Sequence, residues 1–153
     1  TPQPSTTQAI ISVSEVPVFV GVGGGMTNGD RSVRLAEFSE HQGASGVVVN
    51  APISNETIAK MKAVVDIPVV TTIVSGDMDI AGRLAAGADI LNVSGASRTP
   101  EIVTKIRAEF PTVPIIATGG LSRFVVPLCK HKIIYDDALL LKGLMIIYEK
   151  NKA

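Results

Sequence analysis

Three short apolar segments, each with a proline at its second position, recur along this chain at nearly even intervals. They are Val16-Pro17-Val18, Ile67-Pro68-Val69 and Val113-Pro114-Ile115. Between them, Gly43-Ala44-Ser45 and Gly87-Ala88-Asp89 introduce two further runs of β-branched residues, so each interval holds two strand-helix units. Strands that are joined by single helices cannot pair as hairpins. The repeat therefore predicts right-handed crossovers in a parallel sheet.

The apolar pattern predicts strands and helices in alternation. The expected strands cover residues 16–22, 46–50, 67–74, 88–95 and 113–117, with a doubtful sixth at 132–135. The expected helices run from a cap at Ser5 or Thr6 to Val13, from 30 to 42, from a cap at Ser54, from about 79 to 86, from a cap at Thr99 to about 110, and from 137 to 150. This order predicts an α/β fold of parallel (βα) repeats, a partial TIM-barrel-like sheet of five to six strands with surrounding helices.

Chain length argues against a closed eightfold barrel, which takes about 200 residues or more. We expect one α/β domain over residues 1–153, with barrel-like repeats in 1–120 and a helical tail, including one possible short strand, in 121–153. An open sheet exposes unpaired strand edges, so we also expect a homo-oligomer. The tail has Leu141, Leu144, Met145 and Tyr148 at helical spacing, which predicts that it packs back onto the sheet.

Composition excludes several classes of partner. Fourteen basic and fourteen acidic residues cancel, and no Lys/Arg run occurs, so nucleic acid is not an expected partner. The apolar runs stay far below the roughly 18 residues of a membrane span. The single cysteine, Cys129, excludes an internal disulfide and predicts a cytoplasmic location. The start at Thr1, without an initiator methionine, suggests a trimmed or partial sequence.

Parallel α/β folds bind ligands at the carboxyl ends of their strands, which indicates where to look for a site. Turns with small side chains let backbone N–H groups approach a phosphate closely. We therefore expect phosphate or a small phosphorylated molecule as ligand, bound where Ser94-Gly95 and Thr118-Gly119-Gly120 lie side by side. The candidate ligand-binding residues are Gly23, Gly24, Gly25, Asn50, Thr72, Ser75, Asn92, Ser94, Gly95, Thr118, Gly119 and Gly120.

The residues that could carry chemistry each have a structural alternative. Asn92, in a buried strand, either joins strands by a hydrogen bond or meets a ligand. Asp77 and Asp79 could act as a base or a metal ligand, or could cap the following helix. The glycines at 23–25 form either an anion-binding turn or a merely permissive one. No lysine or histidine falls on an expected strand end, so the catalytic residues are unknown beyond these candidates, and no metal site or cofactor is predicted.

Residues 16–120 resemble a known family. The stretches VPVFVGVGGG, GVVVNAP, IPVV followed by GADILNVSG, and VPIIATGG are similar to a bacterial family of (β/α)-barrel proteins of uncertain activity, sometimes labelled hydrolases. They resemble more loosely the phosphate-binding barrels that include aldolases, isomerases and lyases. The resemblance implies a phosphate- or sugar-phosphate-binding domain of enzymatic ancestry, with the reaction (hydrolase, lyase or isomerase type) unassigned.

A second resemblance begins at Ile116. The segment IIATGGLSRFVVPLCKHKIIYDDALLLKGLMIIYEKNK is similar to the carboxy-terminal end of type III pantothenate kinases, which implies phosphoryl transfer from ATP to pantothenate in an actin-like ATPase fold. The rest of the chain lacks that family's Asp-x-Gly-Asn-Thr type phosphate loop. Two alternatives to the barrel function follow: a kinase fragment that binds ATP, or a non-catalytic recombined or designed scaffold.

Overall fold

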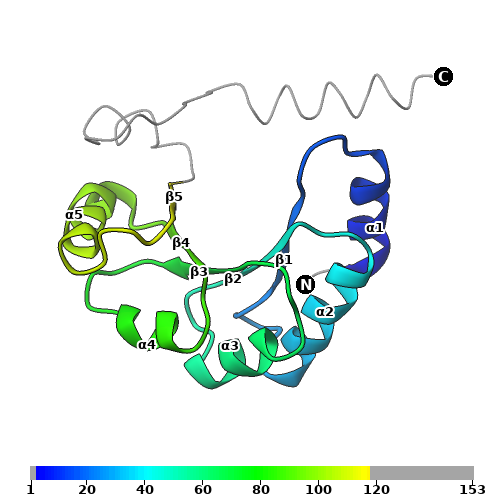
Figure 1. The fold of residues 1–153 in the computed structure, drawn as a ribbon, viewed down its shortest axis with the longest axis horizontal. Helices are drawn as coiled ribbons and strands as arrows, with labels where there is room; N and C mark the ends of the chain where they lie inside the picture. The colour runs from blue at the N-terminus through cyan, green and yellow to red at the C-terminus, as the bar shows by residue number, and fades with distance from the viewer. Residues whose placement is uncertain (1–2, 118–153) are drawn as a thin grey trace.

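The computed structural model describes residues 3–117, which contain five parallel strands alternating with helices (Figure 1). The strands are β1 (Phe19–Gly23), β2 (Gly46–Val49), β3 (Val69–Ile73), β4 (Ile90–Val93) and β5 (Ile115–Ala117). The helices are α1 (Pro4–Val13), α2 (Asp30–His41), α3 (Asn55–Lys62), α4 (Ile80–Ala85), η1 (Ala96–Arg98, a 3-10 turn) and α5 (Thr99–Glu109). The sixth strand and the tail helix of our prediction lie outside the described residues.

The strands lie in the sheet in the same order as in the sequence, β1-β2-β3-β4-β5, and every neighbouring pair is parallel. A doubly wound fold would reverse this order at a switch point, whereas a barrel repeats one geometry at every step. Helices α2 to α5 follow the convex side of the curved sheet (Figure 1). The described residues therefore form the TIM-barrel-like partial sheet that the repeat predicted.

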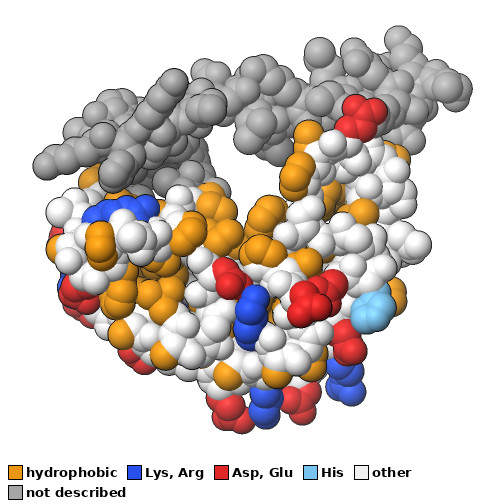
Figure 2. Space-filling model, viewed as in Figure 1, with side chains coloured by type: hydrophobic (Ala, Val, Ile, Leu, Met, Phe, Trp, Pro, Cys, Tyr) orange, Lys and Arg blue, Asp and Glu red, His pale blue; other side chains and the backbone are white. Residues whose placement is uncertain are grey.

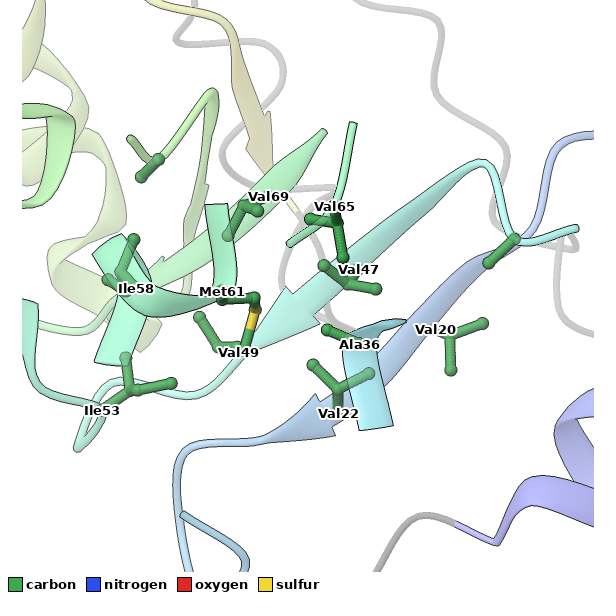
Figure 3. Packing of buried hydrophobic residues seen from close by; sticks show 12 residues of the cluster. Val20, Val22, Ala36, Val47, Val49, Ile53, Ile58, Met61, Val65 and Val69 are labelled. Carbon is green, nitrogen blue, oxygen red and sulfur yellow. The ribbon is translucent and has the colours of Figure 1, made fainter. Parts of the chain in front are cut away.

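Strand alternation places the core between the sheet and the helices. Val22 of β1 and Val49 of β2 are fully buried and point toward Ala36 of α2 and Met61 of α3 (Figure 3). A second cluster joins the later strands to α4 and α5; its buried members are Ile73, Ile80, Leu91, Val93, Ile102 and Ile106. Both clusters lie between the sheet and the helices, so the helix-covered face supplies most of the described core. Burying each such side chain contributes about 1.5–3 kcal/mol to the free energy of unfolding.

Prolines set the beginnings of two strands. The expected strands at 67 and 113 instead begin at Val69 and Ile115, each directly after its proline. Proline has no N–H to donate to the hydrogen bonds between strands, so it stands just before the first paired residue. Its carbonyl can still accept a hydrogen bond from the neighbouring strand. The Pro68 carbonyl accepts the N–H of Val47, and the Pro114 carbonyl accepts that of Leu91.

The start of α3 follows the sequence prediction, whereas two other helix starts depart from it. The Ser54 hydroxyl caps α3 by accepting the Thr57 N–H at 3.2 Å, as predicted. A cap at Ser5 or Thr6 was wrong, because α1 begins at Pro4, and a proline in the first turn has no N–H that needs a cap. The Thr99 cap was also wrong. Thr99 lies inside the first turn of α5, and its hydroxyl accepts the N–H of Gly95 instead.

Two carboxylates fix the loop that enters β3. Glu40 Oε1 accepts the N–H groups of Asp66 and Ile67 at 2.8 and 3.0 Å. Asp89 Oδ2 accepts the Val69 N–H at 2.8 Å and pairs with Lys62 Nζ at 3.0 Å. These bonds lie at the amino ends of the strands, where barrel folds place stability rather than catalysis. Within residues 3–117, no helix is both long enough and apolar enough to span a bilayer.

Candidate site at the carboxyl edge of the sheet

The turn after β1 needs its first two glycines for close packing. Gly23 and Gly24 have φ values of +134° and +95°, which L side chains rarely adopt. A Cβ on Gly24 would lie 2.7 Å from the backbone nitrogen and oxygen of Asn50, because the ends of β1 and β2 touch there. The Gly24 N–H already donates to the Thr27 carbonyl at 2.8 Å. Backbone packing alone thus accounts for these two glycines, whereas Gly25 has open space around its Cα.

The loop after β4 has an unusual backbone. Gly95 has φ −95° and ψ 15°, and Ala96, which follows it, has φ +51°. Ala96 is the only residue other than glycine with a positive φ in the described part of the chain. A right-handed residue followed by a left-handed one forms a nest, in which successive N–H groups converge on one point. In the structure, Thr99 Oγ1 supplies a lone pair to the Gly95 N–H of this pair.

Thr99 and Arg98 hold this loop in place. The Gly95 N–H donates to Thr99 Oγ1 at 3.0 Å, and the Arg98 N–H donates to the Gly95 carbonyl at 3.1 Å. A Cβ on Gly95 would meet the terminal methyl of the Ile102 side chain, so the loop packs closely on α5 and a larger residue there would require Ile102 to move. Sequence reasoning identified Gly95 but missed Ala96, Arg98 and Thr99. The sequence carried no signal for Ala96, because left-handed positions usually hold Gly, Asn or Asp.

Asn92 and Thr72 lie side by side on the face of the sheet that points away from the helices. They are register partners across β3 and β4, and Asn92 Nδ2 donates to Thr72 Oγ1 at 3.3 Å. This bond matches the structural alternative, in which Asn92 joins two strands. A ligand contact by Asn92 stays a prediction.

Asp79 and Asp77 differ in their surroundings. Asp79 Oδ1 caps α4 by accepting the Gly82 N–H at 2.9 Å, and its Oδ2 accepts Asn55 Nδ2, also at 2.9 Å. Asp77 is exposed and lies 3.7 Å from Lys105 Nζ. The capping alternative therefore describes Asp79, while a catalytic role for either residue stays a prediction. Among residues 3–117, no group of three or more His, Cys, Asp or Glu side chains could hold a metal ion.

A hollow of about 400 Å³ opens between the loop after β3 and helix α5. Lys105 Nζ crosses it and donates to the Gly76 carbonyl at 2.6 Å. The hollow lies among the helices and includes neither Asn92 nor Gly95, so it is separate from the nest. Its lining residues are Gly76, Asp77, Met78, Asp79, Ile80, Ala81, Lys105, Ile106 and Glu109.

Arg83 is a buried cation that sequence reasoning missed. Its Nη2 donates to the Ala51 carbonyl at 2.7 Å, while Nε and Nη1 have no hydrogen-bond partner. Burial lowers the pKa of this guanidinium, and the nearby Asp79 carboxylate opposes that shift. Arg83 fixes the backbone of the loop after β2, next to Asn50, so it positions one of the predicted site loops.

Of the other predicted positions, Ser75 Oγ accepts the Asp77 N–H at 3.3 Å, and the Ser94 N–H donates to the Ile73 carbonyl at 2.8 Å. Thr118, Gly119 and Gly120 lie outside the described residues.

Comparisons with known sequences find a match to only part of the chain. No family model matches it. Over 53 residues, 34% of the chain, it is 45% identical to the type III pantothenate kinase of Pelobacter propionicus and 43% identical to that of Geobacter sulfurreducens. These matches cover 21% of each kinase, so the chain spans about a fifth of the length of the curated relatives it matches.

Comparisons with solved structures find barrels. A putative dihydrodipicolinate synthetase from Pseudomonas aeruginosa superposes with a TM-score of 0.70 at 18% identity, over 96% of this chain and 62% of that chain. Phosphonopyruvate hydrolase gives 0.67 at 19%, over 96% and 64%. A 2,3-dimethylmalate lyase of the PEP mutase/isocitrate lyase superfamily gives 0.64 at 16%, over 95% and 62%. The chain thus has a TIM-barrel-like α/β fold that spans just under two thirds of these barrels, together with a shorter segment similar to type III pantothenate kinases.

Proposed function

We propose that this chain binds phosphate or a sugar phosphate at the carboxyl edge of its sheet, in a barrel-like domain of enzymatic ancestry. The observation that carries the proposal is the nest at Gly95 and Ala96. A left-handed alanine costs about 1–2 kcal/mol relative to a right-handed one. Such strain persists only where the surrounding structure enforces it, and it concentrates at functional sites. A right-handed residue followed by a left-handed one, as at Gly95 and Ala96, is the backbone pattern in which successive N–H groups converge, and this supports the proposal.

The charges around the nest suit an anion. Arg98 is exposed and lies two residues beyond Ala96. Residues 90–100 contain no Asp or Glu, the nearest acids along the chain being Asp89 and Glu101. Phosphate groups bind where backbone N–H groups converge beside a cation. In the free protein the Thr99 hydroxyl accepts from the nest, so the ligand would replace or join that oxygen.

The comparisons support the class of site but not a reaction. A barrel similar in fold is named phosphonopyruvate hydrolase, after a phosphonate substrate. Barrels of this architecture place their ligands at the carboxyl ends of the strands, where the nest lies. The reaction, whether hydrolase, lyase or isomerase type, is not assigned by these likenesses.

Thermal unfolding with inorganic phosphate tests the proposal. A ligand that binds only the folded state at ten times its Kd raises the unfolding free energy by about 1.4 kcal/mol, which for a chain of this size is a rise in Tm of roughly 3–6 °C. Arg98→Gln should lose most of that rise. Arg31→Gln, an exposed arginine on α2, should keep it and serves as the matched control. Absence of any rise at millimolar phosphate, with sodium chloride matching the ionic strength, would reject the site.

The second candidate is a kinase fragment that binds ATP. The 53-residue similarity to type III pantothenate kinases favours it. ATP should then raise the Tm at concentrations where inorganic phosphate has no effect, and Arg98→Gln should not change that rise. A chain that responds to neither ligand would be the non-catalytic scaffold of the third alternative.

A further inference from the structure

A buried hydroxyl lies where the two core clusters meet. Thr71 of β3 is fully buried, and its Oγ1 has no hydrogen-bond partner among the described residues. Along the strand, Thr71 stands between Val69 of the first cluster and Ile73 of the second. Across the sheet, its register partners are Val49 of the first cluster and Leu91 of the second. By strand alternation the hydroxyl therefore points toward the helices, at the boundary between the clusters.

Arg83 of α4 faces the same boundary from the helix side. Its neighbour Leu84 packs against the second cluster, and Ala86 packs against the first. On the face shown in Figure 2, Lys and Arg side chains lie over the helices at the surface, whereas Arg83 is only 7% exposed. Its Nη2 donates to the carbonyl of Ala51, two residues beyond Val49, the register partner of Thr71. The guanidinium and the Thr71 hydroxyl are thus directed to the same part of the interior.

Three polar atoms at this boundary lack acceptors or donors. They are Thr71 Oγ1, Arg83 Nε and Arg83 Nη1, and none has a partner within residues 3–117. Unpaired buried polar groups destabilise a folded protein, and native structures pair nearly all of them with protein groups or with ordered water. A valine in place of Thr71 would fill the same space without that cost. The hydroxyl and the guanidinium therefore indicate a bound polar molecule.

The charge of Arg83 is already opposed by a nearby acid. The Asp79 carboxylate raises the pKa of Arg83, against the effect of burial. Its two oxygens accept hydrogen bonds from the Gly82 N–H and from Asn55 Nδ2, and neither pairs with Arg83 Nε or Nη1. The guanidinium thus lacks hydrogen-bond acceptors rather than a counter-charge, which favours a neutral molecule over an anion.

We propose that an internal water molecule bridges the Arg83 guanidinium and the Thr71 hydroxyl. Its oxygen accepts from an Arg83 N–H, and the Thr71 hydroxyl exchanges a second hydrogen bond with it. Buried waters make about three hydrogen bonds, so a backbone carbonyl completes the set. This hydration site joins β3 to α4. Through the bond from Arg83 to the Ala51 carbonyl it also joins the loop after β2.

A high-resolution crystal structure of the protein is the direct test, and it needs no variant. An ordered water should lie within about 3.2 Å of Thr71 Oγ1 and of Arg83 Nε or Nη1. A direct bond between the guanidinium and the hydroxyl, a chloride ion at this point, or no ordered molecule there overturns the proposal.

Thermal unfolding tests the bridge in solution. Thr71→Val removes the hydroxyl at nearly constant shape. If water pairs that hydroxyl, the Tm should fall by roughly 2–4 °C. If the hydroxyl is unpaired, the Tm should rise, because an unsatisfied polar group is lost. In an Arg83→Met background the bridge is already absent, so Thr71→Val should no longer lower the Tm.

Thr71→Ser is the matched control, because it keeps the hydroxyl and loses only a methyl group. Its effect on the Tm should be equal in the parent and in the Arg83→Met background. A Tm for Thr71→Val at or above that of the parent, or an equal fall in both backgrounds, contradicts the proposal.

Discussion

Replacing Glu40 should destabilise the whole chain through two backbone groups that are distant from it in sequence. Its Oε1 accepts the N–H groups of Asp66 and Ile67 at 2.8 and 3.0 Å, and Ile67 is partly buried. Hydrogen bonds to a charged group contribute about 1.5–3 kcal/mol each. After the substitution, water can hydrogen-bond the exposed N–H of Asp66. It reaches the partly buried N–H of Ile67 less well, so most of the loss comes from that group. We therefore expect Glu40→Met to lower the unfolding free energy by about 2 kcal/mol.

The assay is urea denaturation followed by circular dichroism, where the midpoint should fall with an unchanged m value. The loss corresponds to a Tm lower by roughly 4–8 °C for a chain of this size. Glu40→Gln keeps the accepting oxygen and loses only the charge, so about half the effect should remain. Glu37→Gln, an exposed glutamate on the same helix, is the matched control and should change stability by less than about 0.5 kcal/mol. A Glu40→Met protein as stable as that control would refute the role of this carboxylate.

Three further predictions concern the loops at the carboxyl edge. Gly24→Ala should cost more than about 2 kcal/mol in urea denaturation, because its φ is +95° and the new Cβ would meet the Asn50 backbone. Asp79→Ala should cost about 1–2 kcal/mol through the lost α4 cap, while Asp77→Ala, at an exposed position, should be within about 0.5 kcal/mol of the parent. Arg83→Met should change the Tm little, because losing the bond to the Ala51 carbonyl is offset by removing a buried cation with two unpaired nitrogens; a loss of several kcal/mol would contradict this.

The fold could be predicted from sequence because local and repeated signals agree. Proline-led apolar runs, the Ser54 cap and the 3.6-residue stripe of Ile102 and Ile106 each specify one element, and their regular spacing specifies a parallel sheet. The predicted starts of β3 and β5 were too early because an apolar pattern does not show where hydrogen bonding between strands begins. The proline in each run precedes the first paired residue. The cap at Ser5 or Thr6 failed because α1 begins earlier, at Pro4, and the cap at Thr99 failed because Thr99 lies inside the first turn and its hydroxyl accepts the Gly95 N–H.

The candidate site was predictable in position but not in geometry. The rule that ligands lie at strand ends identified Ser94 and Gly95, and the polar alternation of β4 identified Asn92. The left-handed Ala96 depends on how the loop packs on α5, and the bond from Arg83 to the Ala51 carbonyl joins residues distant in sequence. Contacts of this kind are set by tertiary packing. No local pattern encodes them.

The central claim is that an anion binds the nest after β4. The most direct test is an inorganic phosphate titration of the ¹⁵N-labelled protein, followed by amide chemical shifts. The account predicts saturable shifts, with dissociation constants in the millimolar range or tighter, that are largest for the N–H groups of Gly95, Ala96 and Ser97. Shifts confined to other loops, or shifts that sodium chloride reproduces at the same ionic strength, would contradict it.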